Sequence, residues 1–119
     1  MTLEEKERQR FINKLVSNAR AIISNQVALP LGVYKMNQLI SWFDPFKKTA
    51  DVDMSIFRYY DLNVDDLPIG TERLRWNIEK LIEFEKAFDE TNRIFKADIL
   101  RKCSELIDTY NSEKSKELE

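Results

Sequence analysis

The longest stretch of this chain without glycine or proline runs from residue 71 to residue 119. Large apolar residues recur in it every seven positions, at Leu74, Leu81, Phe88 and Phe95. Because nothing in this stretch interrupts helical hydrogen bonding, the pattern predicts one long helix over residues 71–111. Such a helix is roughly 60 Å long, whereas a compact chain of this size has a radius of gyration of about 13 to 14 Å. We therefore expect it to overhang the molecule, to be covered by another long helix, or to lie along a second copy.

A second row of apolar residues lies beside the first, and Glu85 and Asn92 interrupt it. Either these two residues face solvent, or they lie in a seam between helices and determine its register. A bend near residues 89–92 is also open, because most residues there have low helix propensity. Residues 111–119 are predicted to be a frayed, charged tail.

Three shorter segments also have apolar residues at helical spacing, over residues 3–26, 31–43 and 54–62. Thr2 and Glu5 have the spacing of a capping box, and Asp53 is expected to cap the third segment. Residues 1–10 are a polar helix start, expected to project into water. With two glycines, three prolines and no alternating apolar pattern, the sequence predicts a single all-α domain over residues 1–119. Its architecture is predicted to be an antiparallel bundle of about four helices with a long C-terminal helix.

The composition argues against most catalytic and metal chemistry. The chain has no histidine, which is the commonest general base and a usual zinc ligand. Its single cysteine, Cys103, lies among apolar helix positions and is interpreted as a small core side chain, in a reducing, cytoplasmic setting. Carboxylate pairs such as Glu79 and Glu83 are interpreted as a solvated helix face. We predict that the protein is not an enzyme and has no cofactor.

Charge and hydropathy also limit the classes of partner. The net charge is −2, and no concentrated stripe of lysine and arginine predicts nucleic-acid binding. No apolar run approaches the roughly 18 residues of a membrane span, and residues 4–7 do not resemble a signal peptide. We therefore predict no nucleic-acid partner and no membrane span.

One motif points to a metal. Asp61, Asn63, Asp65 and Glu72 occupy the first, third, fifth and last positions of an EF-hand calcium loop, where oxygen atoms surround the ion. Asp66 stands where that loop needs glycine, and Pro68 removes a backbone donor. The sequence favours an ordinary capping turn, and a degenerate calcium-binding module is the alternative.

The stretch over residues 18–36 reads Asn-Ala-Arg-Ala-Ile-Ile-Ser-Asn-Gln-Val-Ala-Leu-Pro-Leu-Gly-Val-Tyr-Lys-Met. With Ile56-Phe57, Leu67-Pro68 and the long charged helix, it resembles an uncharacterised family of short proteobacterial proteins, catalogued as a domain of unknown function. The resemblance covers nearly the whole chain and implies no particular activity. Many similar proteins begin with a transmembrane helix, and we expect none in this sequence.

Helix length leads to the functional prediction. A first helix of about 24 residues spans roughly 36 Å and cannot cover a helix of roughly 60 Å. We expect the C-terminal end of the long helix to be uncovered, and its apolar stripe to form an interface with a second copy or another helical protein. The interface residues are predicted to be Ile99, Leu100, Cys103, Leu106, Ile107 and Tyr110. The predicted function is a non-enzymatic interaction module that self-associates as a homodimer through this helix; the alternative is a monomer in which a bend near residues 89–92 folds this end back.

Four aromatic residues lie beside the predicted core stripes, Trp42, Tyr59, Trp76 and Phe84. They are interpreted as the rim of the core, and an exposed aromatic patch for a partner is the alternative.

Overall fold

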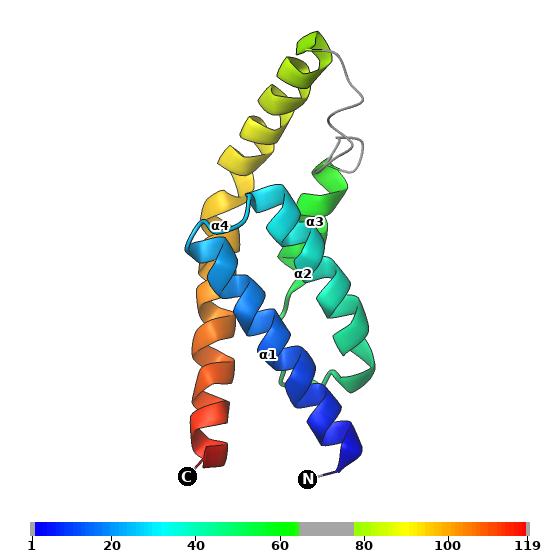
Figure 1. The fold of residues 1–119 in the computed structure, drawn as a ribbon, viewed down its shortest axis with the longest axis vertical. Coiled ribbons are helices and arrows are strands. Elements are labelled where there is room, and N and C mark those ends of the chain that lie inside the picture. Colours follow the sequence, from blue (N-terminus) through cyan, green and yellow to red (C-terminus); the bar gives the residue numbers. More distant parts are fainter. Residues whose placement is uncertain (1, 65–77, 119) are drawn as a thin grey trace.

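The structure is a computed structural model that describes residues 2–64 and 78–118, with residues 111–118 described by their backbone alone. Its helices are α1 (Leu3–Ile23), α2 (Leu29–Phe43), α3 (Ser55–Val64) and α4 (Ile78–Leu118), and a 3-10 turn, η1 (Asp44–Phe46), follows α2. No strand occurs within those ranges. Consecutive α-helices run in opposite directions (Figure 1), so the predicted all-α antiparallel bundle is confirmed.

Local sequence signals account for most helix ends. Glu5 N–H donates to Thr2 Oγ1 at 3.1 Å and Thr2 N–H donates to Glu5 Oε2 at 3.3 Å, which is the predicted capping box. α1 ends at Ile23 rather than near residue 26, because Asn25 takes a left-handed backbone conformation with φ 61°. Ser55 N–H donates to Asp53 Oδ1 at 3.0 Å, so Asp53 caps α3 as predicted.

The core lies where α1, α2 and α3 meet the C-terminal half of α4. α1 and α2 approach closely at Gly32, where an added Cβ would lie 2.6 Å from Cγ1 of Ile22. Asn18 is buried beside this contact, and its Nδ2 donates to the Gly32 carbonyl oxygen at 2.9 Å. This bond satisfies the buried amide and links the two helices.

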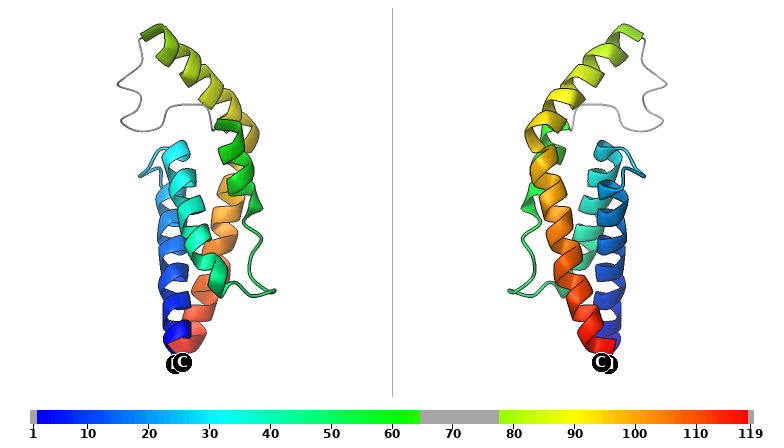
Figure 2. Two further views of the ribbon diagram at one scale, coloured as in Figure 1. Left: turned by 90° about the vertical axis from the view of Figure 1, so that its right-hand side faces the viewer. Right: turned by 90° about the vertical axis from the view of Figure 1, so that its left-hand side faces the viewer.

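α4 is longer than the bundle, and its first part extends beyond the other helices (Figures 1 and 2). Thr91 is the first buried residue of α4. We call residues 78–90 the overhang, although Phe88, near its end, still packs against the core. Ile78 is 75% exposed there and Ile82 is 49% exposed. The radius of gyration is 16.1 Å, larger than the roughly 13 to 14 Å of a compact chain of this length.

The prediction that the C-terminal end of the long helix is uncovered is wrong. Ile99, Cys103 and Leu106 are completely buried and Tyr110 is 2% exposed. Leu100 and Ile107 are half-buried and pack against the same core. α1 runs antiparallel to α4 and lies along its C-terminal half, so the uncovered end is the N-terminal one (Figure 1). The six residues predicted to form an interface pack within a single chain.

α4 is continuous through residues 89–92, where the sequence left a break open. Asn92 lies in the seam between α3 and α4, where its Oδ1 accepts a hydrogen bond from the Tyr60 hydroxyl at 2.6 Å. The Tyr60 ring also meets the Phe95 ring edge-on, with centroids 6.0 Å apart. Glu85 is exposed. The seam interpretation therefore holds for Asn92, and the solvent interpretation holds for Glu85.

The structure also bears on the two ends of the predicted long helix. Its backbone is helical to Leu118, beyond the start of the tail predicted at residue 111. Residues 71–77, with the predicted helix start and the positions of Leu74 and Trp76, lie outside the described residues.

Candidate interaction surfaces

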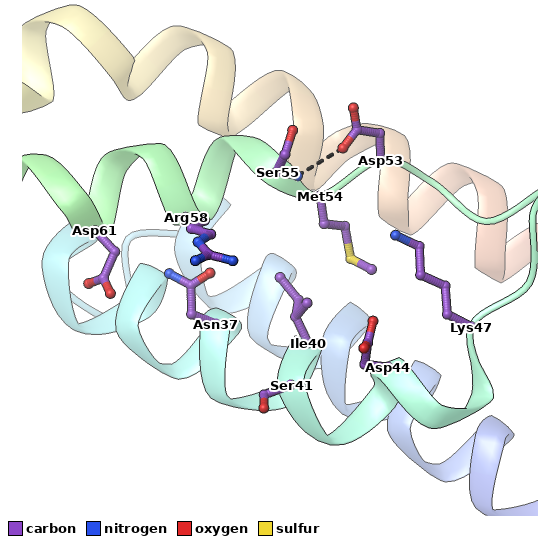
Figure 3. Close-up of a pocket in the computed structure, with 10 residues that line it drawn as sticks. All are labelled: Asn37, Ile40, Ser41, Asp44, Lys47, Asp53, Met54, Ser55, Arg58 and Asp61. Carbon is purple, nitrogen blue, oxygen red and sulfur yellow. Dashed lines mark hydrogen bonds between the residues drawn. The ribbon is translucent and has the colours of Figure 1, made fainter.

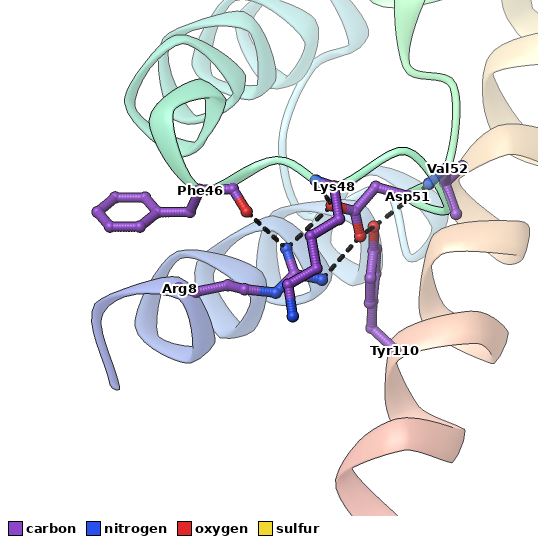
Figure 4. A network of polar contacts seen from close by, with 6 residues as sticks. All are labelled: Arg8, Phe46, Lys48, Asp51, Val52 and Tyr110. Carbon is purple, nitrogen blue, oxygen red and sulfur yellow. Dashed lines mark hydrogen bonds and ion pairs between the residues drawn. The ribbon is translucent and has the colours of Figure 1, made fainter. Parts of the chain in front are cut away.

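A buried polar cluster joins α1, the loop after η1, and α4 (Figure 4). Arg8 Nη1 and Nη2 donate to the two Asp51 carboxylate oxygens at 2.9 and 2.8 Å, and Nη1 also donates to the Phe46 carbonyl oxygen at 3.1 Å. The Tyr110 hydroxyl donates to Asp51 Oδ1 at 2.9 Å, and Lys48 N–H donates to Oδ2 at 2.6 Å. The side chains of Arg8 and Asp51 are only 14% and 4% exposed.

The protonation states of this cluster suit a structural role. Burial raises the pKa of Asp51, but hydrogen bonds from Arg8, Lys48 N–H and Tyr110, with the charge of Arg8, outweigh it and hold that pKa below its ordinary value. Burial and the hydrogen bond to Asp51 raise the pKa of Tyr110 to about 12. At neutral pH the carboxyl group is therefore ionised and the phenol is protonated. We interpret the cluster as a latch between segments distant in sequence.

The latch corrects the expectation for the polar start of α1. Residues 1–10 were predicted to project into water, but Arg8 is largely buried, and its guanidinium carbon lies 5.2 Å from the centre of the Phe43 ring. The sequence could not identify this role because Asp51 is 43 residues away.

A groove of about 520 Å³ lies between α2 and α3 (Figure 3). Its lining carries charges of both signs, from Asp44, Lys47, Asp53, Arg58 and Asp61. Hydrogen bonds from the Ser55 backbone and side chain lower the pKa of Asp53, so this carboxylate is an ionised helix cap and not a proton donor. Among the residues with described side chains, no buried side-chain nitrogen or oxygen atom lacks a hydrogen-bond partner. We interpret this groove as a solvated junction between helices.

The first residues of the predicted calcium loop belong to a helix. Asp61 and Asn63 lie in the last turn of α3 and not in a loop, because α3 continues to Val64, whose side chain is buried in the core. Residues two apart in a helix point roughly 200° apart, so these two side chains diverge, and Asn63 Nδ2 donates to the Tyr59 carbonyl oxygen at 2.8 Å. Asp65 and Glu72 lie outside the described residues. Within the described ranges, no three acidic or cysteine side chains are grouped to hold a metal.

Cys103 is a core side chain, as the sequence indicates. It is completely buried, and burial raises the pKa of its thiol to about 12. We expect a thiol reagent at pH 8 to modify it at least about 100-fold more slowly in the native chain than in urea, because reaction requires unfolding. The control is Ser104→Cys in a Cys103→Ala background, which places a thiol on the exposed neighbouring position. Equal rates for the two thiols would contradict the burial of Cys103.

The outer face of α2 is the first candidate interaction surface. Leu31, Lys35, Gln38 and Trp42 are spaced so that they lie along one side of the helix, and we call them the α2 stripe. All four are exposed, with Leu31 at 39% and Trp42 at 54%, and Tyr34 is 48% exposed beside them. Lys35 is the single charged residue in the fifteen-residue helix. Leu31, Tyr34 and Trp42 together leave large apolar side chains on this face in water, so the face is a candidate contact.

The overhang carries the second candidate surface. Ile78, Ile82, Glu85 and Asp89 repeat the spacing of the α2 stripe, and we call them the α4 stripe. All four are exposed. Neither stripe stands out in the sequence, because the most regular apolar rows belong to the core. The near-absence of charge in α2 was the available signal.

Three of the four aromatic residues that lie beside the predicted core stripes are among the described residues, and they differ in exposure. Trp42 and Tyr59 are exposed, at 54% and 57%, whereas Phe84 is half-buried in the overhang. Only Trp42 among them lies in one of the two stripes.

No helix within the described ranges has the length and hydropathy to cross a membrane. No protein-family model, curated protein or solved structure matches this chain. The resemblance to the proteobacterial family stays a prediction.

Proposed function

We propose that this chain is a non-enzymatic helical interaction module that self-associates through its long C-terminal helix, α4. The part of α4 that makes the contact is the overhang and not the C-terminal half. The exposure of Ile78 and Ile82 on a segment that projects beyond the core is the observation that supports this proposal.

Energetics favour covering these two side chains. Single exposed apolar residues are common on monomers, but Ile78 and Ile82 are one turn apart and lie together on a projecting helix. Burying such a side chain fully is worth about 1.5 to 3 kcal/mol, so a partner helix that covers both would gain a useful part of an association energy.

Two further parts of the proposal concern catalysis and location. The absence of histidine from the sequence and the internally bonded state of the latch favour a role other than catalysis. A cytoplasmic location agrees with Cys103, which is a free, buried thiol.

Sedimentation velocity tests the self-association. We expect the wild-type chain to show species heavier than 14.2 kDa at about 100 μM, since a contact between short helices is smaller than a standard interface and therefore weak. The variant Ile78→Asp/Ile82→Asp is expected to sediment as a single chain with unchanged helical circular dichroism. The control is Ile94→Asp, which alters an isoleucine that is 59% exposed but lies roughly 120° round the helix from Ile82. A wild-type chain that stays at 14.2 kDa at every concentration contradicts the proposal.

A further inference from the structure

We infer that the α4 stripe of one copy docks, antiparallel, on the α2 stripe of a second copy. This inference rests on the proposed self-association and adds the identity of the surface that receives the overhang. The contact joins two different surfaces of the chain and is therefore heterologous.

The two stripes match in length and spacing. Each places four exposed side chains at intervals of four, three and four residues, from Leu31 to Trp42 on α2 and from Ile78 to Asp89 on α4. Eleven residues of helix rise about 17 Å, so two such stripes can lie along each other over their full length.

Side-chain chemistry selects the antiparallel direction. Antiparallel docking places Ile78 opposite Trp42, so that two apolar side chains meet, and it places Glu85 opposite Lys35. Parallel docking would place Ile82 against Lys35 and Glu85 against Gln38, so that neither charged side chain would gain an ion-pair partner. Within the described residues, Lys35 and Glu85 have no ion-pair partner of their own.

The N-terminus of α2 adds a further match. Its N-cap residue, Ala28, makes no side-chain capping hydrogen bond, and the first turn contains no acidic residue. Antiparallel docking brings Asp89 to Leu31, next to this end. A carboxylate is favoured there because the first backbone N–H groups of a helix carry partial positive charge.

The wider charge distribution favours a contact between unlike surfaces. The overhang has five acidic and two basic side chains, a net charge of −3. Residues 10–48, which include α2 and most of α1, have six basic and one acidic side chain, a net charge of +5. Two overhangs would repel each other, whereas an overhang and the more basic region of residues 10–48, which contains α2, would attract.

Complementation between two defective variants is the decisive test. Trp42→Asp damages the α2 stripe, and Ile78→Asp/Ile82→Asp damages the α4 stripe, so each variant alone is expected to sediment at 14.2 kDa. A mixture of the two retains one intact stripe of each kind. We expect it to form a one-to-one heterodimer and nothing larger. Circular dichroism checks that both variants stay folded, as expected for exposed positions.

The outcomes separate this inference from the proposed function. If wild type associates and Trp42→Asp associates equally well, the α2 stripe is not the docking surface and the inference is overturned, while self-association stands. If the mixture stays monomeric, the inference is overturned as well. If wild type itself is monomeric, both proposals fail.

Charge reversal tests the register. Lys35→Glu and Glu85→Lys are each expected to weaken association about two- to fivefold, and the double variant to return it to within about twofold of wild type. The matched control is Glu90→Lys, which makes the same charge change in the overhang but off the stripe, and should weaken association less. A double variant weaker than both single variants overturns the antiparallel pairing.

The dependence of association on salt concentration distinguishes docking of the α4 stripe on the α2 stripe from pairing of two overhangs, because the two arrangements respond to salt in opposite directions. Salt screens charge, so association between the acidic overhang and the basic region of residues 10–48 should weaken as salt rises. Pairing of two overhangs would instead strengthen with salt, and that result would overturn the inference.

Discussion

Replacing Asp51 with alanine is expected to destabilise the folded chain by about 3 to 5 kcal/mol, the cost of breaking a buried ion pair from one side. Its carboxylate accepts hydrogen bonds from the Arg8 guanidinium, the Lys48 backbone and the Tyr110 hydroxyl. Without it, the largely buried guanidinium loses its charged partner and keeps only the Phe46 carbonyl oxygen as an acceptor, and the buried Tyr110 hydroxyl loses the carboxylate as its acceptor. Urea denaturation followed by circular dichroism measures the change.

Asp98→Ala is the matched control for this variant. Asp98 also pairs with an arginine, Arg101 at 2.6 Å, but its side chain is 57% exposed. Exposed pairs contribute little, so we expect a change of about 0.5 kcal/mol or less. If the two aspartate variants cost the same, the latch is not a stabilising contact.

The latch also makes stability depend on pH. The pKa of Asp51 is lower in the folded chain than its ordinary value of 3.8. The stability that it contributes is therefore fully present above the unfolded-state pKa and is lost as pH falls through the folded-state pKa. We expect the difference in unfolding free energy between wild type and Asp51→Ala to be constant near neutral pH and to shrink below about pH 4.

Leu106→Lys is expected to unfold the chain. Leu106 is completely buried in the core. Loss of a buried leucine side chain alone costs about 2 to 5 kcal/mol, and an unpaired ammonium group in the core adds a desolvation cost. Because domains of this size are stable by only about 5 to 15 kcal/mol, the helical circular dichroism signal should fall sharply.

This result differs from the one that the sequence predicts. An exposed stripe at Leu106 would let the lysine variant dissociate a dimer and leave the helices intact. The control is Ile94→Lys, which changes an isoleucine of the same helix that is 59% exposed and should alter stability by about 0.5 kcal/mol or less. A folded, cooperatively unfolding Leu106→Lys variant would contradict the burial of this position.

Local rules determine the helices of this protein and several of their ends. The Thr2 and Glu5 capping box and the Asp53 cap act over three residues or fewer, so they can be read from the sequence. The long run without glycine or proline likewise predicts a helix that exceeds the bundle. These features depend on backbone geometry and hydrogen bonds between near neighbours.

The tertiary structure decided which end of α4 is covered and which residues form the latch. An apolar stripe shows which face of a helix is buried but not which element covers it, so Ile99 and Leu106 fit a core and an interface equally well. Arg8, Asp51 and Tyr110 show no local pattern, because 43 residues separate the first two and 59 separate the last two. Contacts over such distances depend on how the helices align, and that alignment results from the packing of all four helices together.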